Sequence, residues 1–223
     1  PERCRVCYTC VRECPAKAIR IHEGQAQVLT ERCIGCGNCV RVCSQNAKQV
    51  MDGTDRVNSL QESSKKTAAI IAPSFPAEFP ELGYEQVVGT LRAIGFTYVH
   101  EVAFGADLVA REYRKLLTSD KQSRFIATSC PAIVGYVERY YPELVGCLAP
   151  IVSPMIAAAR ALRQLHGPKT QVVFIGPCIA KKGEAWSDDV EGDVQEVLTF
   201  AELRQMITDA ALEWLTNHAS DDR

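Results

Sequence analysis

Beyond residue 66, the chain alternates short apolar runs with longer segments in which apolar residues recur at helical spacing. The run from Ala68 to Ala72 is continuous and is closed by Pro73, which predicts a strand buried on both faces. Apolar positions within 84–94 predict a helix that stops at Gly95. Further strands are expected over 98–103, 124–127, 171–175 and 194–198, and further helices over 106–117, 133–141, 154–165 and 200–211. This alternation predicts an α/β domain with a mostly parallel sheet.

The first 55 residues follow a different pattern. Apolar residues in 18–21 and 26–29 flank a Glu23-Gly24 turn and predict a short hairpin. Such a segment has too little apolar surface to fold alone, so it needs covalent or metal staples. We therefore expect a small α+β domain at 1–55, a polar and partly helical linker at 56–66, and the α/β domain at 67–223.

Eight of the eleven cysteines form two quartets that share the spacing C-x2-C-x2-C-x3-C. Proline follows the last cysteine of the first quartet, whereas Ser44 follows the last cysteine of the second. This spacing is typical of bacterial ferredoxins with two 4Fe-4S clusters, in which the fourth ligand of each cluster comes from the other repeat. The predicted ligands are Cys4, Cys7, Cys10 and Cys43 for cluster 1, and Cys33, Cys36, Cys39 and Cys14 for cluster 2. Zinc and disulfides are the alternatives, but zinc sites usually pair two well-separated C-x2-C units.

Charge and hydropathy narrow the class further. The 25 basic and 27 acidic residues nearly balance and form no basic run, which argues against nucleic acid as a partner. No apolar run approaches the roughly 20 residues that span a bilayer. A thiol-rich chain without a leader is expected in a reducing cytoplasm. Because the chain begins at Pro1 rather than Met, we expect it to be an excerpt from a longer polypeptide.

Two further cysteines are expected at the carboxyl ends of predicted strands, where ligands bind in parallel sheets. Cys130 follows 124–127 and Cys178 follows 171–175, each beside a proline. The remaining cysteine, Cys147, is read as a buried structural thiol. The four histidines stand at no ligand spacing and are read as surface or capping residues.

Around these cysteines the chain resembles the iron-only (FeFe) hydrogenases, large-subunit type. Residues 128–131, Thr-Ser-Cys-Pro, resemble the first signature of that family, T-S-C-C-P, and 176–184 resemble the second, M-P-C-x-x-K-x-x-E. The flanks agree at 72–74, 104–108, 136–144 and 153–154, and an N-terminal two-cluster ferredoxin domain is usual in the family.

The resemblance implies an H-cluster, a 4Fe-4S cubane joined through a cysteine to a two-iron centre. Cys130 and Cys178 match two cubane ligands. Lys181 matches the lysine that hydrogen-bonds a cyanide of the two-iron centre, and Glu184 matches the glutamate of the signature. The residues implied to line the cofactor pocket are Pro73, Ser74, Ser129, Ser153, Pro154 and Pro177.

The departures from the family pattern bear on assembly and turnover. The third signature, which supplies the other two cubane ligands, is absent, so a complete H-cluster is expected only if a downstream part is present. The positions of the family's proton relay are Ser129, Tyr113, Leu116 and Ala149 here, and none matches the usual proton carrier. Gly176 replaces a usual methionine and is expected to open space. Ser129 has an alternative role as the cap of a helix that begins at Pro131.

These observations lead to one functional hypothesis and two rivals. We expect an iron-sulfur redox protein of the FeFe-hydrogenase family, slow and sensory, that exchanges electrons with a ferredoxin-like or other redox protein and uses dihydrogen and protons as substrates. The first rival is an ordinary hydrogenase with an unusual proton route. The second is a non-catalytic electron-transfer or scaffold protein that never receives a two-iron centre.

Overall fold

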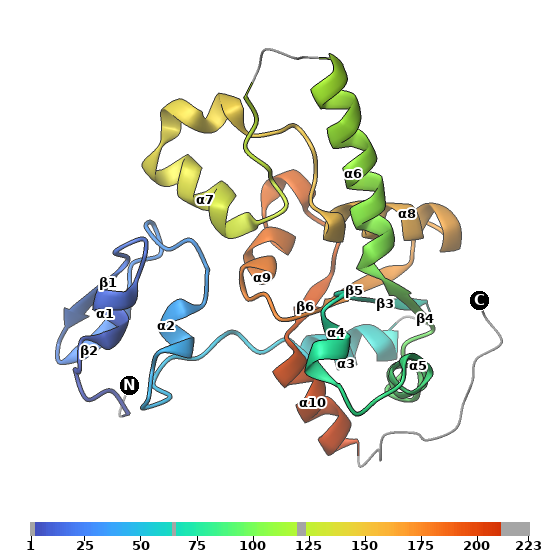
Figure 1. The fold of residues 1–223 in the computed structure, drawn as a ribbon. Helices are drawn as coiled ribbons and strands as arrows, with labels where there is room; N and C mark the ends of the chain where they lie inside the picture. Colours follow the sequence, from blue (N-terminus) through green and yellow to red (C-terminus); the bar gives the residue numbers. More distant parts are fainter. Residues whose placement is uncertain (1–2, 64–65, 120–123, 211–223) are drawn as a thin grey trace. The chain divides into compact units, whose positions relative to one another are not determined.

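A computed structural model describes residues 3–63, 66–119 and 124–210 (Figure 1). Ala211, the expected end of the last helix, lies outside these ranges. The chain divides into two compact units. Unit 1 consists of Pro1–Met51, Arg124–Pro150 and Cys178–Gly183, and unit 2 of Asp52–Ser123, Ile151–Pro177 and Glu184–Arg223. This division differs from the expected boundaries, because two excursions of the presumed α/β domain fold with the cysteine-rich segment.

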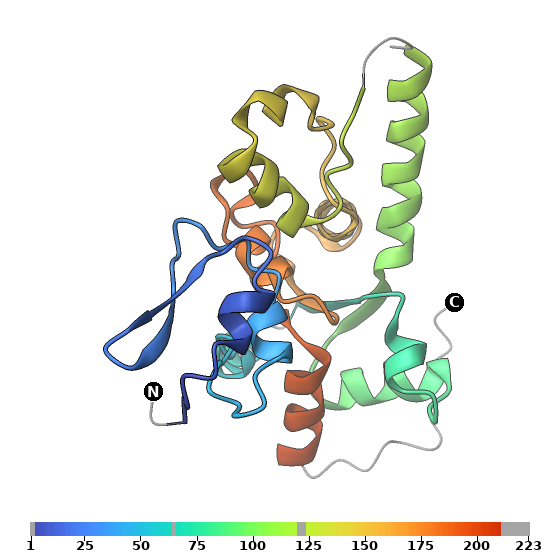
Figure 2. The same ribbon diagram turned by 60° about the vertical axis from the view of Figure 1, so that its left-hand side comes forward.

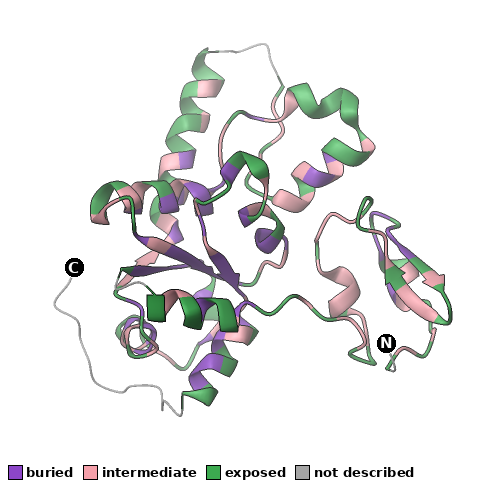
Figure 3. Cartoon of the chain, turned by 180° about the vertical axis from the view of Figure 1, so that it is seen from behind, coloured by how far each residue is buried: buried purple, intermediate pink, exposed green. Residues whose placement is uncertain are grey.

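Unit 2 contains a four-stranded parallel sheet in the order β4-β3-β5-β6. The strands are β3 (Thr67–Ile71), β4 (Tyr98–Glu101), β5 (Gln171–Ile175) and β6 (Glu196–Leu198). Every residue of β3 is buried, as its unbroken apolar run predicts, and Figure 3 shows the sheet as mostly buried. The chain passes from β3 to β4 on one side and later to β5 on the other. The switch point therefore lies between β3 and β5, at the end that leads into Pro73 and Pro177.

Helices cover both faces of this sheet (Figures 1 and 2). Helices α6 (Val102–Ser119) and α8 (Pro154–His166) lie on one side, and α3 (Thr54–Ser63), α5 (Tyr84–Ala93) and α10 (Phe200–Asp209) on the other. Shorter helices are α4 (Phe75–Glu78), α9 (Ala180–Ala185) and the 3-10 helix η2 (Asp188–Val190). A doubly covered parallel sheet confirms the predicted α/β class.

Helix α3 occupies most of the segment expected as a linker. Its Val57 is completely buried in the core of unit 2, and Glu202 accepts a hydrogen bond from the backbone N of Gly53 at 2.8 Å. The polar composition reflects the solvent-facing side of a short helix whose inner side buries one valine. Residues 54–63 are thus an integral part of unit 2.

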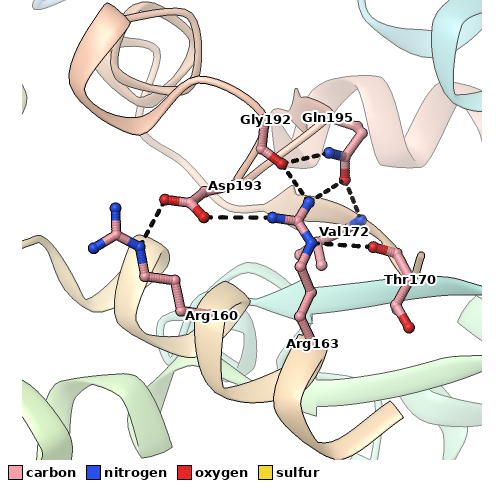
Figure 4. A network of polar contacts seen from close by, with 7 residues as sticks. All are labelled: Arg160, Arg163, Thr170, Val172, Gly192, Asp193 and Gln195. Atoms are coloured by element: carbon pink, nitrogen blue, oxygen red, sulfur yellow. Dashed lines mark hydrogen bonds and ion pairs between the residues drawn. The ribbon is translucent and has the colours of Figure 1, made fainter. Parts of the chain in front are cut away.

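A network of arginine contacts fastens α8 to the loop before β6 (Figure 4). The carboxylate of Asp193 accepts hydrogen bonds from Arg160 at 2.8 Å and from Arg163 at 3.4 Å. Arg163 also donates to the carbonyl oxygens of Gly192 and Thr170 and to the side chain of Gln195. Because burial lowers the pKa of Arg163, these acceptors are needed to keep its charge inside the unit.

The interpretation of the histidines as surface or capping residues is wrong for His100 and His166. His100 on β4 and His166 at the end of α8 are both half-buried, and their Nε2 atoms lie 3.0 Å apart. The ring of His166 also stacks on Tyr98 with 3.8 Å between centroids. The two residues are 66 positions apart, so no sequence spacing could reveal a contact made by a strand and a distant helix.

Unit 1 contains the predicted hairpin, β1 (Ile19–His22) and β2 (Gln25–Val28), together with α1 (Thr9–Glu13) and α2 (Asn38–Arg41). Helix α7 (Pro131–Tyr140) and the 3-10 helix η1 (Pro142–Cys147) complete it. Its small core consists of Cys10, Cys14, Ala16, Ala18 and Ile19. The hydroxyl of Tyr140 donates to the carbonyl oxygen of Ala16, so the end of α7 is tied to the loop that follows Cys14.

Three local predictions in this region need correction. Residues 124–127 do not form a strand of the sheet, since they make only an isolated parallel bridge between Ile126 and Leu148. Cys130 therefore does not follow a strand of the sheet. The prediction failed because a short apolar run does not distinguish a strand from an extended segment. The N-cap of α7 is Cys130 and no side chain caps that helix, so Ser129 is not its cap. In unit 2, Ser153 stands at the N-cap of α8, where its hydroxyl makes no capping hydrogen bond.

Candidate metal centres

The first four predicted ligands surround one cavity. The thiols of the cluster 1 set line a space of about 430 Å³ within unit 1, although they come from both cysteine repeats. Its lining also includes Arg5, His22 and Lys48. The cavity brings together Cys4, Cys7, Cys10 and Cys43.

The second set surrounds another cavity of about 380 Å³, also within unit 1. Here too one cysteine comes from the opposite repeat, as the spacing predicts. Apolar residues such as Ile19 and Ile34 make up much of the wall, and Lys182 also lines it. The cavity brings together Cys14, Cys33, Cys36 and Cys39.

The loops after the two crossing cysteines share one conformation. The backbone N of Ala18 donates to Sγ of Cys14, and that of Ala47 donates to Sγ of Cys43, each at 3.3 Å. In both loops the residue before that alanine, Lys17 or Asn46, has a left-handed φ, of 46° and 48° respectively. Amide donors aimed at sulfur suit thiolates, because hydrogen bonding favours the charged form.

The thiols differ in how readily they ionise. Hydrogen bonds from the backbone of Val6 and Ala26 lower the pKa of Cys4, and hydrogen bonding to Thr9 lowers the pKa of Cys7. Burial instead raises the pKa of Cys10 and of Cys39. Each set thus holds one thiol whose pKa is raised by its surroundings, and binding of a cationic metal group would favour its thiolate form.

These arrangements fit a 4Fe-4S cluster in each cavity. A single zinc ion draws its sulfur ligands to about 2.3 Å from one point. Among residues 3–63, 66–119 and 124–210, no three His, Cys, Asp or Glu side chains converge in that way. The four thiols of each set instead line a cavity of about 430 or 380 Å³.

Cys130, Cys178 and Lys181 all belong to unit 1. Lys181 is only 8% exposed, and its Nζ donates to the carbonyl oxygen of Ser129 at 3.2 Å. The backbone N of Lys181 donates to the carbonyl oxygen of Cys178 at 3.2 Å. The ammonium therefore joins the segments that carry the two motif cysteines. Ser129 and Cys130 themselves are exposed.

The segment after Cys178 packs into the wall of the second cavity. Ile179, Ala180, Lys182 and Gly183 all line it. A Cβ at Gly37 would lie 2.6 Å from Cδ1 of Ile179, so this position requires glycine for the approach. The second cysteine repeat and the second motif thus share one surface within unit 1.

The remaining residues of the resemblance belong to unit 2. Pro73 and Ser74 follow β3, Pro177 follows β5, and Ser153 and Pro154 begin α8. Ser153 is 2% exposed, and its hydroxyl has no hydrogen-bond partner among the described residues. Glu184 lies half-buried in α9, where its carbonyl oxygen accepts the hydroxyl of Ser187 at 2.8 Å.

The space expected beside Gly176 is not open. A Cβ at this position would lie 2.7 Å from Cζ of Phe174 and 2.8 Å from Cβ of Ala72. The ring of the buried Phe174 therefore occupies the space that a side chain at residue 176 would enter. The expectation that Gly176 opens space is wrong.

The four positions that correspond to the family's proton relay are divided between the two units. Tyr113 and Leu116 are half-buried on α6 in unit 2, whereas Ala149 is buried and Ser129 exposed in unit 1. Sequence reasoning missed Lys48 and Tyr140. Alignment of the two cysteine repeats could have revealed Lys48, whereas nothing local marks Tyr140.

Comparison with known proteins agrees with this site. A family model described as the iron only hydrogenase large subunit, C-terminal domain, matches residues 65–222, and a 4Fe-4S dicluster domain matches residues 1–44. Iron hydrogenase 1 of Clostridium pasteurianum is 30% identical over 182 residues, 71% of this chain and 32% of that protein. The periplasmic [Fe] hydrogenase large subunit of Nitratidesulfovibrio vulgaris is 32% identical over 242 residues, 95% of this chain and 57% of that protein.

More distant similarity extends to a second kind of protein. The cytosolic Fe-S cluster assembly factor NAR1 of Yarrowia lipolytica is 26% identical over 136 residues, 53% of this chain and 28% of that protein. A solved structure described as revealing stepwise [FeFe]-hydrogenase H-cluster assembly has a TM-score of 0.59 at 22% identity, over 74% of this chain and 49% of that one. At that identity the structural match concerns the fold alone.

Fold and site define an iron-sulfur protein with a 4Fe-4S dicluster domain and an H-cluster-type α/β domain. The chain belongs to the iron-only (FeFe) hydrogenase family. It spans about a third and just over half of the length of the two hydrogenases above. Within the described residues, no helix combines the length and apolarity needed to cross a membrane.

Proposed function

We propose that this protein passes electrons through two 4Fe-4S clusters to or from an H-cluster-type site, where dihydrogen is interconverted with two protons and two electrons. Cluster 1 is assigned to Cys4, Cys7, Cys10 and Cys43, and cluster 2 to Cys33, Cys36, Cys39 and Cys14. Cys130 and Cys178 are assigned as a partial ligand set for the third cubane.

The observation that carries this proposal is the composition of the second cavity. Its wall includes the four cysteines of cluster 2 and, from Ile179 onward, residues that directly follow Cys178. A cluster in this cavity would lie next to the segment that holds a ligand of the third cubane. This arrangement supports an electron path that joins cluster 1, cluster 2 and the third site in that order.

The chain's own residues have defined tasks at the third site. When bound, the H-cluster supplies the iron chemistry that cleaves or forms dihydrogen. Lys181 would place a buried ammonium beside anionic ligands, where a charge-assisted hydrogen bond is strong. The same ammonium donates to Ser129 and so positions the residue before Cys130.

We further propose that turnover is slow and serves sensing rather than bulk hydrogen metabolism. Rapid turnover needs groups that accept and release protons close to the working pH. Leu116 and Ala149 have no exchangeable side-chain proton, and the serine at 129 is a far weaker acid than the thiol of active relatives.

Anaerobic reconstitution and maturation of the protein, in a form that includes any downstream part, test both proposals. We expect about eight irons in the two N-terminal clusters, infrared bands of CO and cyanide, and low current for hydrogen on an electrode. High turnover would contradict the sensory role alone. Four irons or fewer, or zinc instead, would contradict the cluster assignment.

A non-catalytic iron-sulfur scaffold is the second candidate, favoured by the similarity to NAR1 assembly factors. In that case the two N-terminal clusters form, but no CO or cyanide bands appear after maturation. Infrared spectra therefore separate the two functions without an activity assay.

We propose a soluble redox protein, ferredoxin-like or of another kind, as the electron partner, with the cytoplasm as the compartment. One hydrogenase relative is named as periplasmic, so location needs its own measurement. Cell fractionation with antibody detection checks the compartment. Stopped-flow mixing with reduced ferredoxin checks electron transfer by the bleaching of cluster absorbance.

A further inference from the structure

At one pair of structurally equivalent positions, one cysteine repeat places an apolar side chain on its cavity wall and the other places an ammonium. Both loops share the amide-to-sulfur hydrogen bond and the left-handed residue described above, so residues five after Cys14 and Cys43 correspond. These residues are Ile19, which is 6% exposed and lines the cavity of cluster 2, and Lys48, which lines the cavity of cluster 1. The second repeat thus has an ammonium group where the first has an apolar side chain.

The ammonium of Lys48 is held in place by the hairpin. Its Nζ donates to the carbonyl oxygen of Ala26 on β2, and the residue is half-buried. Because both the donor and the strand that accepts are part of unit 1, the charge has a fixed place beside the thiols.

Lys48 shares a cavity with the thiols of one predicted cluster. It lines the space bounded by Cys4, Cys7, Cys10 and Cys43, and it is not among the described residues that line the second cavity. The fixed ammonium therefore lies on the wall of the cluster 1 cavity.

The other charged groups on these cavities are placed differently. Arg5 is exposed, and His22 and Glu23 face each other in an exposed pair at 3.9 Å on the hairpin turn. Lys182 is the charged side chain on the second cavity and belongs to the segment after Cys178. Arg5 also corresponds to an apolar residue of the other repeat, Ile34, since each stands one residue after the first cysteine of its quartet, but Arg5 is exposed whereas Lys48 is half-buried.

We propose that Lys48 sets the reduction potential of cluster 1 by stabilising the reduced form. This inference depends on the proposed ligation of both clusters. Reduction transfers one electron from a reduced carrier to a cluster whose four thiolates already make it anionic, and no proton need move. A fixed ammonium nearby attracts the added negative charge, and burial strengthens the attraction. Lys48 therefore favours the reduced form of cluster 1.

Redox titration of the reconstituted protein, followed by electron paramagnetic resonance, tests the proposal. In Lys48→Met and Lys48→Gln, the potential of cluster 1 should fall by at least about 59 mV, a tenfold change in the one-electron equilibrium. The potential of cluster 2 should fall by less. Lys48→Arg keeps the charge and should stay close to the unmodified protein. Arg20→Gln removes an exposed cation that bonds Gln27 on the hairpin, and should leave both potentials unchanged.

The possible failures are distinguishable. If the unmodified protein binds no clusters, the proposed ligation is wrong and this inference falls with it. If both neutral variants carry about eight irons with unchanged potentials, the inference alone is wrong. If the neutral variants lose the irons of cluster 1 while Lys48→Arg retains them, Lys48 is needed for assembly instead, which also overturns a role in setting the potential.

Discussion

The Nζ of Lys181 lies 3.2 Å from the carbonyl oxygen of Ser129 and donates a hydrogen bond to it. Fifty-two positions separate the two residues in the chain, yet this bond joins the segments that carry Cys130 and Cys178. An ammonium that is 8% exposed needs such an acceptor, since an unpartnered buried charge is costly. The lysine of the second motif therefore has a structural task in the protein before any cofactor binds.

Replacement of Lys181 by methionine should destabilise the cluster-reconstituted protein. A hydrogen bond from a charged donor contributes about 1.5–3 kcal/mol, so the free energy of unfolding should fall by about that amount. Urea titration monitored by circular dichroism measures the change. Lys169→Met, at an exposed position, is the control and should stay within about 0.5 kcal/mol. Equal effects of the two variants would contradict a structural role for Lys181.

Alkylation of the cluster-free protein, whose folded state is first checked by circular dichroism, should discriminate between its thiols. Cys7 is exposed and its pKa is lowered by Thr9, whereas burial raises the pKa of Cys39. Because the thiolate is the reactive form, iodoacetamide at about pH 7.5 should modify Cys7 several-fold faster, and the difference should narrow at about pH 9.5. Peptide mass spectrometry gives the two rates, and urea-unfolded protein, in which they should converge, is the control. Faster reaction of Cys39 at the lower pH would be incompatible with this structure.

The histidine pair should make stability depend on pH. Burial is the main cause that lowers the pKa of both His100 and His166, with His166 and Lys66 respectively as the second causes. The unfolded chain titrates near pH 6.5 and binds more protons than the folded one just below that value. Stability should therefore be complete above about pH 6.5 and fall as the pH drops through the lower folded-state values.

Thermal unfolding between about pH 5 and pH 8 measures this dependence. His166→Gln should reduce the slope below about pH 6.5, because the His100 ring then lacks its partner and one titrating group is gone. His22→Gln, at an exposed position of the hairpin, should leave the slope unchanged. A slope that survives in His166→Gln would point to other groups.

Replacement of Gly105 by alanine should force α6 and α8 apart. The added Cβ would lie 2.2 Å from the carbonyl oxygen of Pro154 and 2.9 Å from the backbone N of Ala158. Since both neighbours are backbone atoms, the helices must shift, at a cost of about 1–3 kcal/mol or more. Gly146→Ala meets no atom within 4 Å and should change stability by less than about 0.5 kcal/mol. Chemical denaturation of the two variants compares them directly, and an unaffected Gly105→Ala protein would contradict the close helix contact.

The sequence by itself determined the elements whose signals are local. The unbroken apolar run of β3, the Glu23-Gly24 turn between β1 and β2, and the spacing of the eight cysteines each depend on residues that are neighbours in the chain. Periodicity and turn chemistry report such neighbours directly. The α/β class and the grouping of cysteines across repeats followed from these signals.

Only the tertiary structure decided which distant residues meet. Helix α3 joins the core through Val57, residues 124–127 leave the sheet, and Tyr140 reaches the carbonyl oxygen of Ala16. The side chain of Lys48 is directed by a hydrogen bond to a strand 22 positions away. Such contacts depend on where separate segments pack, and the choice of packing partner leaves no periodic pattern in the sequence of either segment.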